Sequence, residues 1–175
     1  MNLASVVIGH DADHMALIDG DDHIDFGTLR RRVSTMQRDL TERGVGLGTP
    51  VALATGNDSA FVVSTLAVLG LGGIVMPLNP SSPTSELARK LAVASPAMLL
   101  VGHAGRPHLG DPAVGIPTVD LIEMNARAAE VANGGDVAEP TIVDRPDDAP
   151  AFYMATSGVS GAAKVAVLSH HNLSW

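Results

Sequence analysis

A run of hydroxyl, glycine and lysine residues near the C-terminus has the composition of a phosphate-binding loop. The segment Thr156-Ser157-Gly158-Val159-Ser160-Gly161-Ala162-Ala163-Lys164 contains three hydroxyl side chains, two glycines and one of the two lysines in the chain. Glycines let backbone N–H groups approach a ligand closely, and consecutive N–H groups can converge on an anion. A lysine adds a point charge that suits phosphate. The segment is therefore predicted to cradle a polyphosphate.

The residues around this loop predict a strand on each side of it. The Walker A pattern requires a lysine directly after the glycine and a helix directly after the lysine. Here Lys164 follows Gly161 by three residues, and the β-branched apolar run Val165–Leu168 comes next. We therefore expect strand–loop–strand, with phosphate held by loop N–H groups. The residues alone leave an ordinary Gly/Ser hairpin turn as an open alternative.

Composition limits the kinds of protein to consider. The 175 residues are 46% hydrophobic and 17% charged, which predicts one globular domain with a real core. The net charge is −8, and the only basic cluster is Arg30-Arg31-Arg32, so no nucleic-acid partner is expected. These arginines are predicted to lie on the solvated face of a helix. The chain has no cysteine, which excludes disulfides and thiolate nucleophiles.

Two segments bear on location. The N-terminus lacks the basic region and the long apolar run of a signal peptide, so the cytoplasm is the expected compartment. The stretch Ser59–Ser85 has no charged residue and is long enough to span a bilayer. Glycines and prolines divide it, however, and predict a buried helix over 58–69 followed by a strand over 74–78. No transmembrane span is expected.

Predicted strands alternate with predicted helices along most of the chain. Strands are expected at 15–18, 24–26, 51–54, 74–78, 97–101, 116–119 and 151–155, and helices at 26–40, 58–69, 82–94 and 121–131. The predicted N-caps are Asp25, Asn57 and Ser82, and Gly44 is the predicted C-terminal glycine of the first helix. Strands that are apolar throughout indicate parallel βαβ units covered on both faces. Residues 133–150 are predicted to be an irregular surface connection.

Other groupings of reactive residues are predicted to be structural. The segment His10–His14 is too short for all its side chains to face one metal ion, and Asp19–His23 lacks the glycine and glutamate of a calcium loop. Gly70–Gly73 precedes a strand where a dinucleotide fingerprint precedes a helix. His170 and His171 have no carboxylate or nucleophile partner in the sequence and are expected to begin a short helix. No metal site and no catalytic residue are predicted.

Several sequence blocks resemble the adenylate-forming (AMP-binding) enzymes, particularly those of the acyl-CoA synthetase type. Tyr153–Lys164, followed by Leu168–Leu173, is similar to the phosphate-loop signature of these enzymes, and four further blocks fall in the family's order and approximate spacing. These blocks are Asp25–Leu29, Gly48–Leu53, Asn57–Phe61 and Pro77–Pro80. The resemblance extends from Met15 to the end of the chain. It implies an α/β fold made of the parallel βαβ units of the family's N-terminal subdomain, cut short.

The resemblance also implies a two-step reaction. A small-molecule carboxylate attacks the α-phosphate of ATP, bound with Mg²⁺, to give an acyl-adenylate and pyrophosphate, and a thiol such as coenzyme A then takes the acyl group. Fatty acid metabolism is one setting for such a ligase. Position by position, hydroxyls would come from Thr156, Ser157 and Ser160, backbone freedom from Gly158 and Gly161, and the phosphate-pairing charge from Lys164.

The chain departs from the family pattern at three positions in the loop. Val159 replaces a hydroxyl residue, Ala163 replaces a proline, and Val165 replaces the glycine after the lysine. Losing a hydroxyl removes one hydrogen bond to a charged partner, worth about 1.5–3 kcal/mol where that bond is made. A weaker or altered handling of the nucleotide is therefore expected.

The resemblance predicts that residues 1–175 are a partial AMP-binding domain that ends just after the phosphate loop. The adenine-binding motifs, the acyl pocket and the C-terminal domain of the family would then lie in a missing remainder. The chain alone is expected to be inactive. A non-catalytic nucleotide- or partner-binding remnant is the alternative, and a Rossmann-type oxidoreductase has less support because the dinucleotide fingerprint is lacking.

Overall fold

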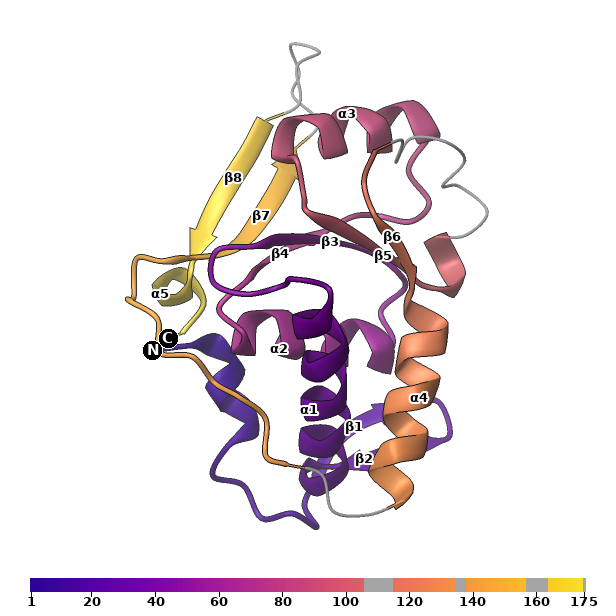
Figure 1. Cartoon of the computed structure of the whole chain (residues 1–175), viewed down its shortest axis with the longest axis vertical. Coiled ribbons are helices and arrows are strands. Elements are labelled where there is room, and N and C mark those ends of the chain that lie inside the picture. The colour runs from indigo at the N-terminus through magenta and orange to yellow at the C-terminus, as the bar shows by residue number, and fades with distance from the viewer. Residues whose placement is uncertain (106–114, 135–137, 157–163, 175) are drawn as a thin grey trace.

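A six-stranded sheet forms the centre of the molecule (Figure 1). The computed structural model describes residues 1–105, 115–134, 138–156 and 164–174. The strands of the main sheet lie in the order β6-β5-β3-β4-β7-β8, and β1 and β2 form a separate two-stranded ribbon. The strands are β1 (Met15–Asp19), β2 (Asp22–Asp25), β3 (Pro50–Ala54), β4 (Ile74–Pro77), β5 (Met98–Val101), β6 (Thr118–Asp120), β7 (Pro150–Thr156) and β8 (Lys164–Ser169).

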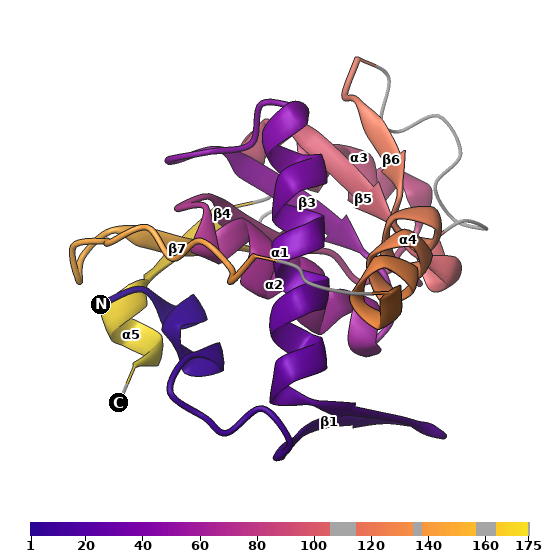
Figure 2. The same cartoon turned by 60° about the horizontal axis from the view of Figure 1, so that its bottom comes forward.

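Helices cover both faces of this sheet. They are η1 (Leu3–Val7), α1 (Phe26–Glu42), α2 (Ser59–Gly70), α3 (Thr84–Ala94), η2 (His103–Gly105), α4 (Leu121–Gly134) and α5 (His170–Leu173). Figure 1 shows α3 on one face and α1, α2 and α4 on the other. Figure 2 shows the length of α1, which contacts both α2 and α4.

Strand β3 illustrates why the predicted strands are apolar throughout. Val51 and Leu53 belong to the core beneath α1 and α2. Ala52 and Ala54 point to the opposite face, where they join the core under α3. Successive strand residues face opposite sides, so a strand covered on both faces needs apolar residues at every position. The predicted α/β fold class is confirmed.

All neighbouring strands from β6 to β7 are parallel, and only β8 is antiparallel to its neighbour. The chain passes from β3 through α2 to β4, then crosses back through α3 to β5 on the other side of β3. Parallel strands bring their carboxyl ends to one edge, and ligands of open α/β sheets bind outside that edge. The ends of β3, β4, β5 and β7 therefore mark the side of the molecule where a site is expected.

The ends of α1 form as the sequence predicts. The Asp25 carboxylate accepts the Thr28 N–H at 2.6 Å, and this hydrogen bond lowers the pKa of Asp25. At the other end Gly44 has φ 84°, and its N–H donates to the Thr41 carbonyl at 2.9 Å. The Val45 N–H donates to the Leu40 carbonyl at 3.0 Å, which completes a Schellman motif.

Two predicted caps are wrong by one residue. Helix α2 is capped by Asp58, whose carboxylate accepts the Phe61 N–H at 2.9 Å, and not by Asn57. Helix α3 begins at Thr84, after an extended Pro83 that has no side chain able to cap it. The Ser82 hydroxyl instead lies 3.5 Å from the Glu86 carboxylate. In each helix the predicted cap and the observed cap are adjacent residues, and the backbone conformation of the folded chain selects the second one.

The arginine cluster is not on a solvated face. Arg32 is buried and donates to the Asp22 carboxylate at 3.0 Å. Arg30 donates to the Val7 and His10 carbonyls, and Arg31 to the Ala132 carbonyl at 2.8 Å. The prediction failed because these guanidinium groups reach other elements, which lie between 10 and 101 residues away in the sequence. They tie α1 to the N-terminal segment, to β2 and to α4.

The connection from 138 to 149, which we call the strap, is irregular as predicted, but it is hydrogen-bonded to the helical layer. Its Val143 N–H donates to the Gly70 carbonyl at 2.8 Å. The buried Gln37 amide pairs with both backbone groups of Thr141, at 2.7 and 2.8 Å. Within the described residues, no helix has the length and apolar character needed to cross a membrane.

Candidate functional site

The predicted phosphate loop joins β7 to β8, which form an antiparallel hairpin. The hairpin runs from the pair Pro150–Ser169 at its base to the pair Thr156–Lys164 beside the loop. Ser157, Gly158, Ser160 and Gly161 lie outside the described residues, so their predicted roles stay predictions. The structure does place Thr156 and Lys164, which are the first and last of the predicted site residues.

Thr156 and Lys164 lie directly opposite one another in the hairpin, and both are exposed. Residues directly opposite in an antiparallel pair project from the same face. The Thr156 hydroxyl also donates to the Lys164 carbonyl at 3.4 Å. None of the described carboxylates pairs with Lys164, whereas the other lysine, Lys90, contacts Glu86 at 2.6 Å. The hydroxyl of Thr156 and the ammonium group of Lys164 therefore lie on the same face of the hairpin, at the two residues that flank the loop.

Strand β7 brings the loop to the carboxyl edge of the sheet. It is parallel to β4, with Val75 and Phe152 in register, so its last residue lies at the same edge as the ends of the other parallel strands. Tyr153 and Ala155 pack against the core beneath α3. Figure 1 shows the hairpin extending away from the helical layer, with its loop end beside α3. The fold thus presents the loop where ligands of such sheets bind.

A cleft of about 620 Å³ opens at this edge. It is lined by the segments that follow β3 and β4, by Ala104 after β5, and by Met154 of β7. The lining residues are Thr55, Gly56, Asn57, Phe61, Pro77, Leu78, Asn79, Pro80, Ser81, Ala104 and Met154. None of them is charged, and Asn57, Asn79, Thr55 and Ser81 supply amides and hydroxyls. The volume is typical of a small-molecule site.

Close backbone packing shapes one wall of this cleft. A Cβ atom on Gly102 would collide with the Thr55 side chain, and one on Gly105 would collide with the Ala54 carbonyl oxygen. The chain after β5 can therefore press against the end of β3 only because both positions are glycine. This packing places Ala104 in the cleft wall.

A second cleft, of about 300 Å³, lies between the ends of β3 and β5 on the side of α2 and α4. It contains the carboxylates of Asp19 and Asp58, which accept the N–H groups of Ser59 at 2.8 Å and Phe61 at 2.9 Å. The hydrogen bond from the Ser59 backbone lowers the pKa of Asp19, so this carboxylate is charged at neutral pH. Two carboxylates repel phosphate, so this cleft does not suit a polyphosphate.

His170 takes a structural position, as the sequence predicts, but it is also completely buried. It is the first residue of α5, which Ser169 caps through a reciprocal pair of hydrogen bonds with Asn172. Its partner is the Leu3 backbone, 167 residues away in the sequence. No local pattern in the sequence indicates a contact at that separation.

Comparison with known proteins identifies the family. The family described as AMP-binding enzyme matches residues 6–175. The chain belongs to this family. Its curated relatives include a 4-coumarate–CoA ligase-like protein of Oryza sativa, which is 34% identical over 83% of the chain and 27% of the relative. Bacitracin synthase 1 of Bacillus licheniformis is 25% identical over 92% of the chain and 3% of its own length.

Solved structures of AMP-binding family members have the same fold. ATP-bound MatB from Rhodopseudomonas palustris superposes with a TM-score of 0.79 at 28% identity, over 99% of this chain and 35% of MatB. VinN in complex with 3-methylaspartate gives a TM-score of 0.81 at 20% identity, which supports the fold alone. The chain thus spans about a quarter of the rice relative and about a third of MatB. The relatives are adenylate-forming enzymes, as the sequence blocks predicted.

Proposed function

We propose that this chain is the N-terminal portion of an ATP-dependent acyl-activating ligase. In the first step a carboxylate oxygen attacks the α-phosphorus of ATP, the bond to the β-phosphate oxygen breaks, and pyrophosphate leaves. In the second step a thiol such as that of coenzyme A attacks the acyl carbon and AMP leaves. The observation that carries the proposal is the position of Thr156 and Lys164 at the carboxyl edge, in a chain of the AMP-binding family.

The hairpin would bind the leaving pyrophosphate. The hydroxyls of Thr156, Ser157 and Ser160 donate to phosphate oxygens, Gly158 and Gly161 let the backbone approach, and Lys164 supplies the positive charge. Negative charge develops on the leaving group as its bond breaks, and donors fixed in advance stabilise that charge. Lys164 is exposed and has no ion pair with a carboxylate among the described residues, which supports this role because no such pair has to break before phosphate binds.

Mg²⁺ would arrive bound to the nucleotide. The described residues contain no group of three or more metal-capable side chains. Mg²⁺ commonly keeps several waters and is held through substrate phosphates with one or two carboxylates. Loop N–H groups, hydroxyls and one lysine would bind the phosphate oxygens, and the metal ion would enter the site together with the triphosphate.

The neutral cleft would hold an uncharged part of the reactants. Its lining carries amides and hydroxyls beside apolar groups, and Met154 connects it to the strand that carries the loop. The arm that bears the thiol of coenzyme A has this mixture of amide and methylene groups. Charged parts of the substrates are better placed at Lys164.

Calorimetric titration with Mg²⁺–ATP and with AMP tests the proposed phosphate site. A loop that holds the β- and γ-phosphates predicts that ATP binds at least about tenfold more tightly than AMP, because only ATP gains the charge-assisted bonds. Equal affinities would contradict this assignment. The chain alone is expected to give no carboxylate-dependent ATP–pyrophosphate exchange, and exchange above background would show that these 175 residues suffice for adenylation.

A further inference from the structure

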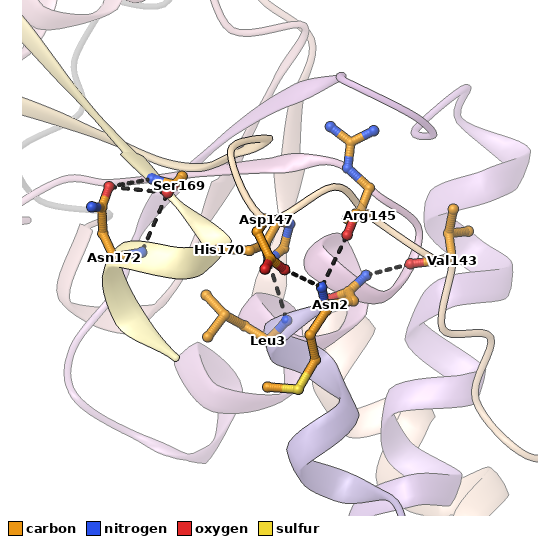
Figure 3. Close-up of polar contacts among 9 residues, drawn as sticks. Asn2, Leu3, Val143, Arg145, Asp147, Ser169, His170 and Asn172 are labelled. Carbon is orange, nitrogen blue, oxygen red and sulfur yellow. Dashed lines mark hydrogen bonds and ion pairs between the residues drawn. The ribbon is translucent and has the colours of Figure 1, made fainter. Parts of the chain in front are cut away.

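Three segments far apart in the sequence meet at the base of the β7–β8 hairpin (Figure 3). They are the N-terminal residues Asn2 and Leu3, the end of the strap at Val143–Asp147, and His170 after β8. We call this group the N-terminal clamp. The buried Asn2 amide donates to the Leu69 carbonyl at 2.7 Å and to the Val143 carbonyl at 2.9 Å. These bonds join the N-terminus to both α2 and the strap.

His170 connects the N-terminal segment to the hairpin. Its Nδ1 atom accepts the Leu3 N–H at 3.1 Å. Its own backbone N–H donates to the Ala149 carbonyl at 3.1 Å, directly before β7 begins. The next residue, His171, donates its N–H to the Asp147 carbonyl at 2.9 Å. The side chain and backbone of one residue therefore join the first turn of the protein to both strands of the hairpin.

The geometry fixes the protonation state of this imidazole. An Nδ1 atom that accepts a hydrogen bond carries no proton, so the neutral ring bears its proton on Nε2. Nε2 is buried and has no partner among the described residues. Burial lowers the pKa of His170, the nearby Arg145 and N-terminal ammonium lower it further, and Asp147 opposes them. The ring is thus neutral at physiological pH.

We propose that His170 holds the N-terminal clamp together at the base of the hairpin only while its imidazole is neutral, and that protonation of this ring in acid opens the clamp. Protonation places a proton on Nδ1, so that two donors face each other and the bond to Leu3 is lost. The charged ring would also be buried near Arg145. Since the hairpin carries the predicted phosphate loop at its other end, opening the clamp would loosen the positioning of Thr156 and Lys164. That consequence rests on the proposed function, whereas the clamp itself does not.

The charged groups around the ring favour this direction of switching. The charges of Arg145 and Asp147 on the strap and of the Met1 ammonium on the N-terminal segment act on the ring, and His171 lies beside it on α5. The Met1 ammonium contacts the Asp147 carboxylate at 2.6 Å, so the anion that acts on the ring among the described residues is already engaged. Figure 3 shows the Arg145 guanidinium directed away from the Asp147 carboxylate. A charged His170 would find no free counter-ion in this group.

Hydrogen exchange at the Leu3 amide tests the clamp directly. As the pH falls from about 8 to about 5, we expect the protection of this amide, corrected for the intrinsic exchange rate, to fall by about tenfold in the wild type. In His170→Asn the amide oxygen occupies the place of Nδ1 but does not titrate, so protection should change by less than about twofold. His171→Asn is the matched control and should behave as the wild type. Loss of protection at the same pH in wild type and His170→Asn would overturn the proposal.

A measurement on the wild type keeps the proposal testable if the variant does not fold. The ¹⁵N shifts of the His170 ring at neutral pH should show Nδ1 without a proton and Nε2 with one. A proton on Nδ1 would overturn the proposal.

Nucleotide binding tests the link to the loop. The ratio of Mg²⁺–ATP affinities, His170→Asn over wild type, should rise by about tenfold between about pH 8 and about pH 5. A constant ratio would remove the link to the loop. Absence of ATP binding at every pH would refute the proposed function, while the exchange result would still decide the clamp.

Discussion

The pairing of Gln37 with the strap offers a prediction whose size can be worked from the structure. The Gln37 side chain is only 4% exposed, and its amide makes two short hydrogen bonds to the Thr141 backbone. A net hydrogen bond contributes about 0.5–1.5 kcal/mol. Gln37→Met keeps the volume but loses both bonds, so we expect the free energy of unfolding to fall by about 2 kcal/mol. Gln37→Ala also removes a buried methylene and leaves a cavity, which brings the loss to about 3 kcal/mol.

Thr141→Ala is the matched control, because only the backbone of Thr141 takes part in the pairing. Its free energy of unfolding should stay within about 0.5 kcal/mol of the wild type. Urea unfolding followed by far-UV circular dichroism measures all three variants. A loss of about 2 kcal/mol should lower the melting temperature by roughly 4–8 °C in a chain of this size. If Gln37→Met is as stable as Thr141→Ala, the pairing does not anchor the strap and the reasoning is wrong.

Two further predictions concern the first helix and the cleft wall. Asp25→Ala should cost about 1 kcal/mol through loss of the α1 cap. Because the folded pKa of Asp25 is lowered, its stabilising contribution is complete above its ordinary pKa of about 3.8 and is lost progressively as the pH falls from there through the lowered folded pKa. Denaturation at pH 7 and pH 3 should therefore show a stability gap between wild type and variant that is smaller at pH 3, and an equal gap would contradict the assignment. Gly105→Ala should lose about 2 kcal/mol or more, because its Cβ collides with the Ala54 carbonyl oxygen. Gly46→Ala, which meets nothing within 4 Å, should differ little from wild type, and equal thermal stability of the two glycine variants would argue against the close packing.

The βαβ core could be predicted from the sequence because its signals are local. The apolar strands β3, β4 and β5 and the amphipathic α1 each lie within a continuous window, and the Asp25 cap and the Gly44 turn lie beside the helix that they bound. Their periodicity and caps depend on neighbours a few residues away. The α/β fold class and the parallel direction of the strands followed from these elements.

The contacts that the sequence did not predict are those that join different elements of the fold. Gln37 on α1 pairs with Thr141, 104 residues later, and no local pattern indicates that contact. Arg32 looked solvated, but β2 folds back to place Asp22 against it. The link between Leu3 and His170 is longer still. Sequence patterns identify which residues can form hydrogen bonds, whereas the tertiary path decides which ones meet.

The structure describes the two ends of the predicted phosphate loop, and the loop's role stays a prediction. Thr156 and Lys164 lie opposite each other at the carboxyl edge, which the spacing of the motif did not require. The roles of Ser157, Gly158, Ser160 and Gly161 depend on the resemblance to AMP-binding enzymes and on the position of the hairpin that carries them. Pyrophosphate binding by a Lys164 variant can test whether this hairpin binds phosphate.

The affinity of Lys164→Ala for Mg²⁺–pyrophosphate tests the central claim most directly. The chain has only two lysines, so Lys90→Ala removes the same charge from α3 and is the natural control. If Lys164 pairs with phosphate, its removal should weaken binding by about tenfold or more, as expected for a charge-assisted hydrogen bond, while Lys90→Ala should bind nearly as the wild type does. Equal affinities for the two variants would contradict the assignment of this hairpin as the pyrophosphate-binding loop.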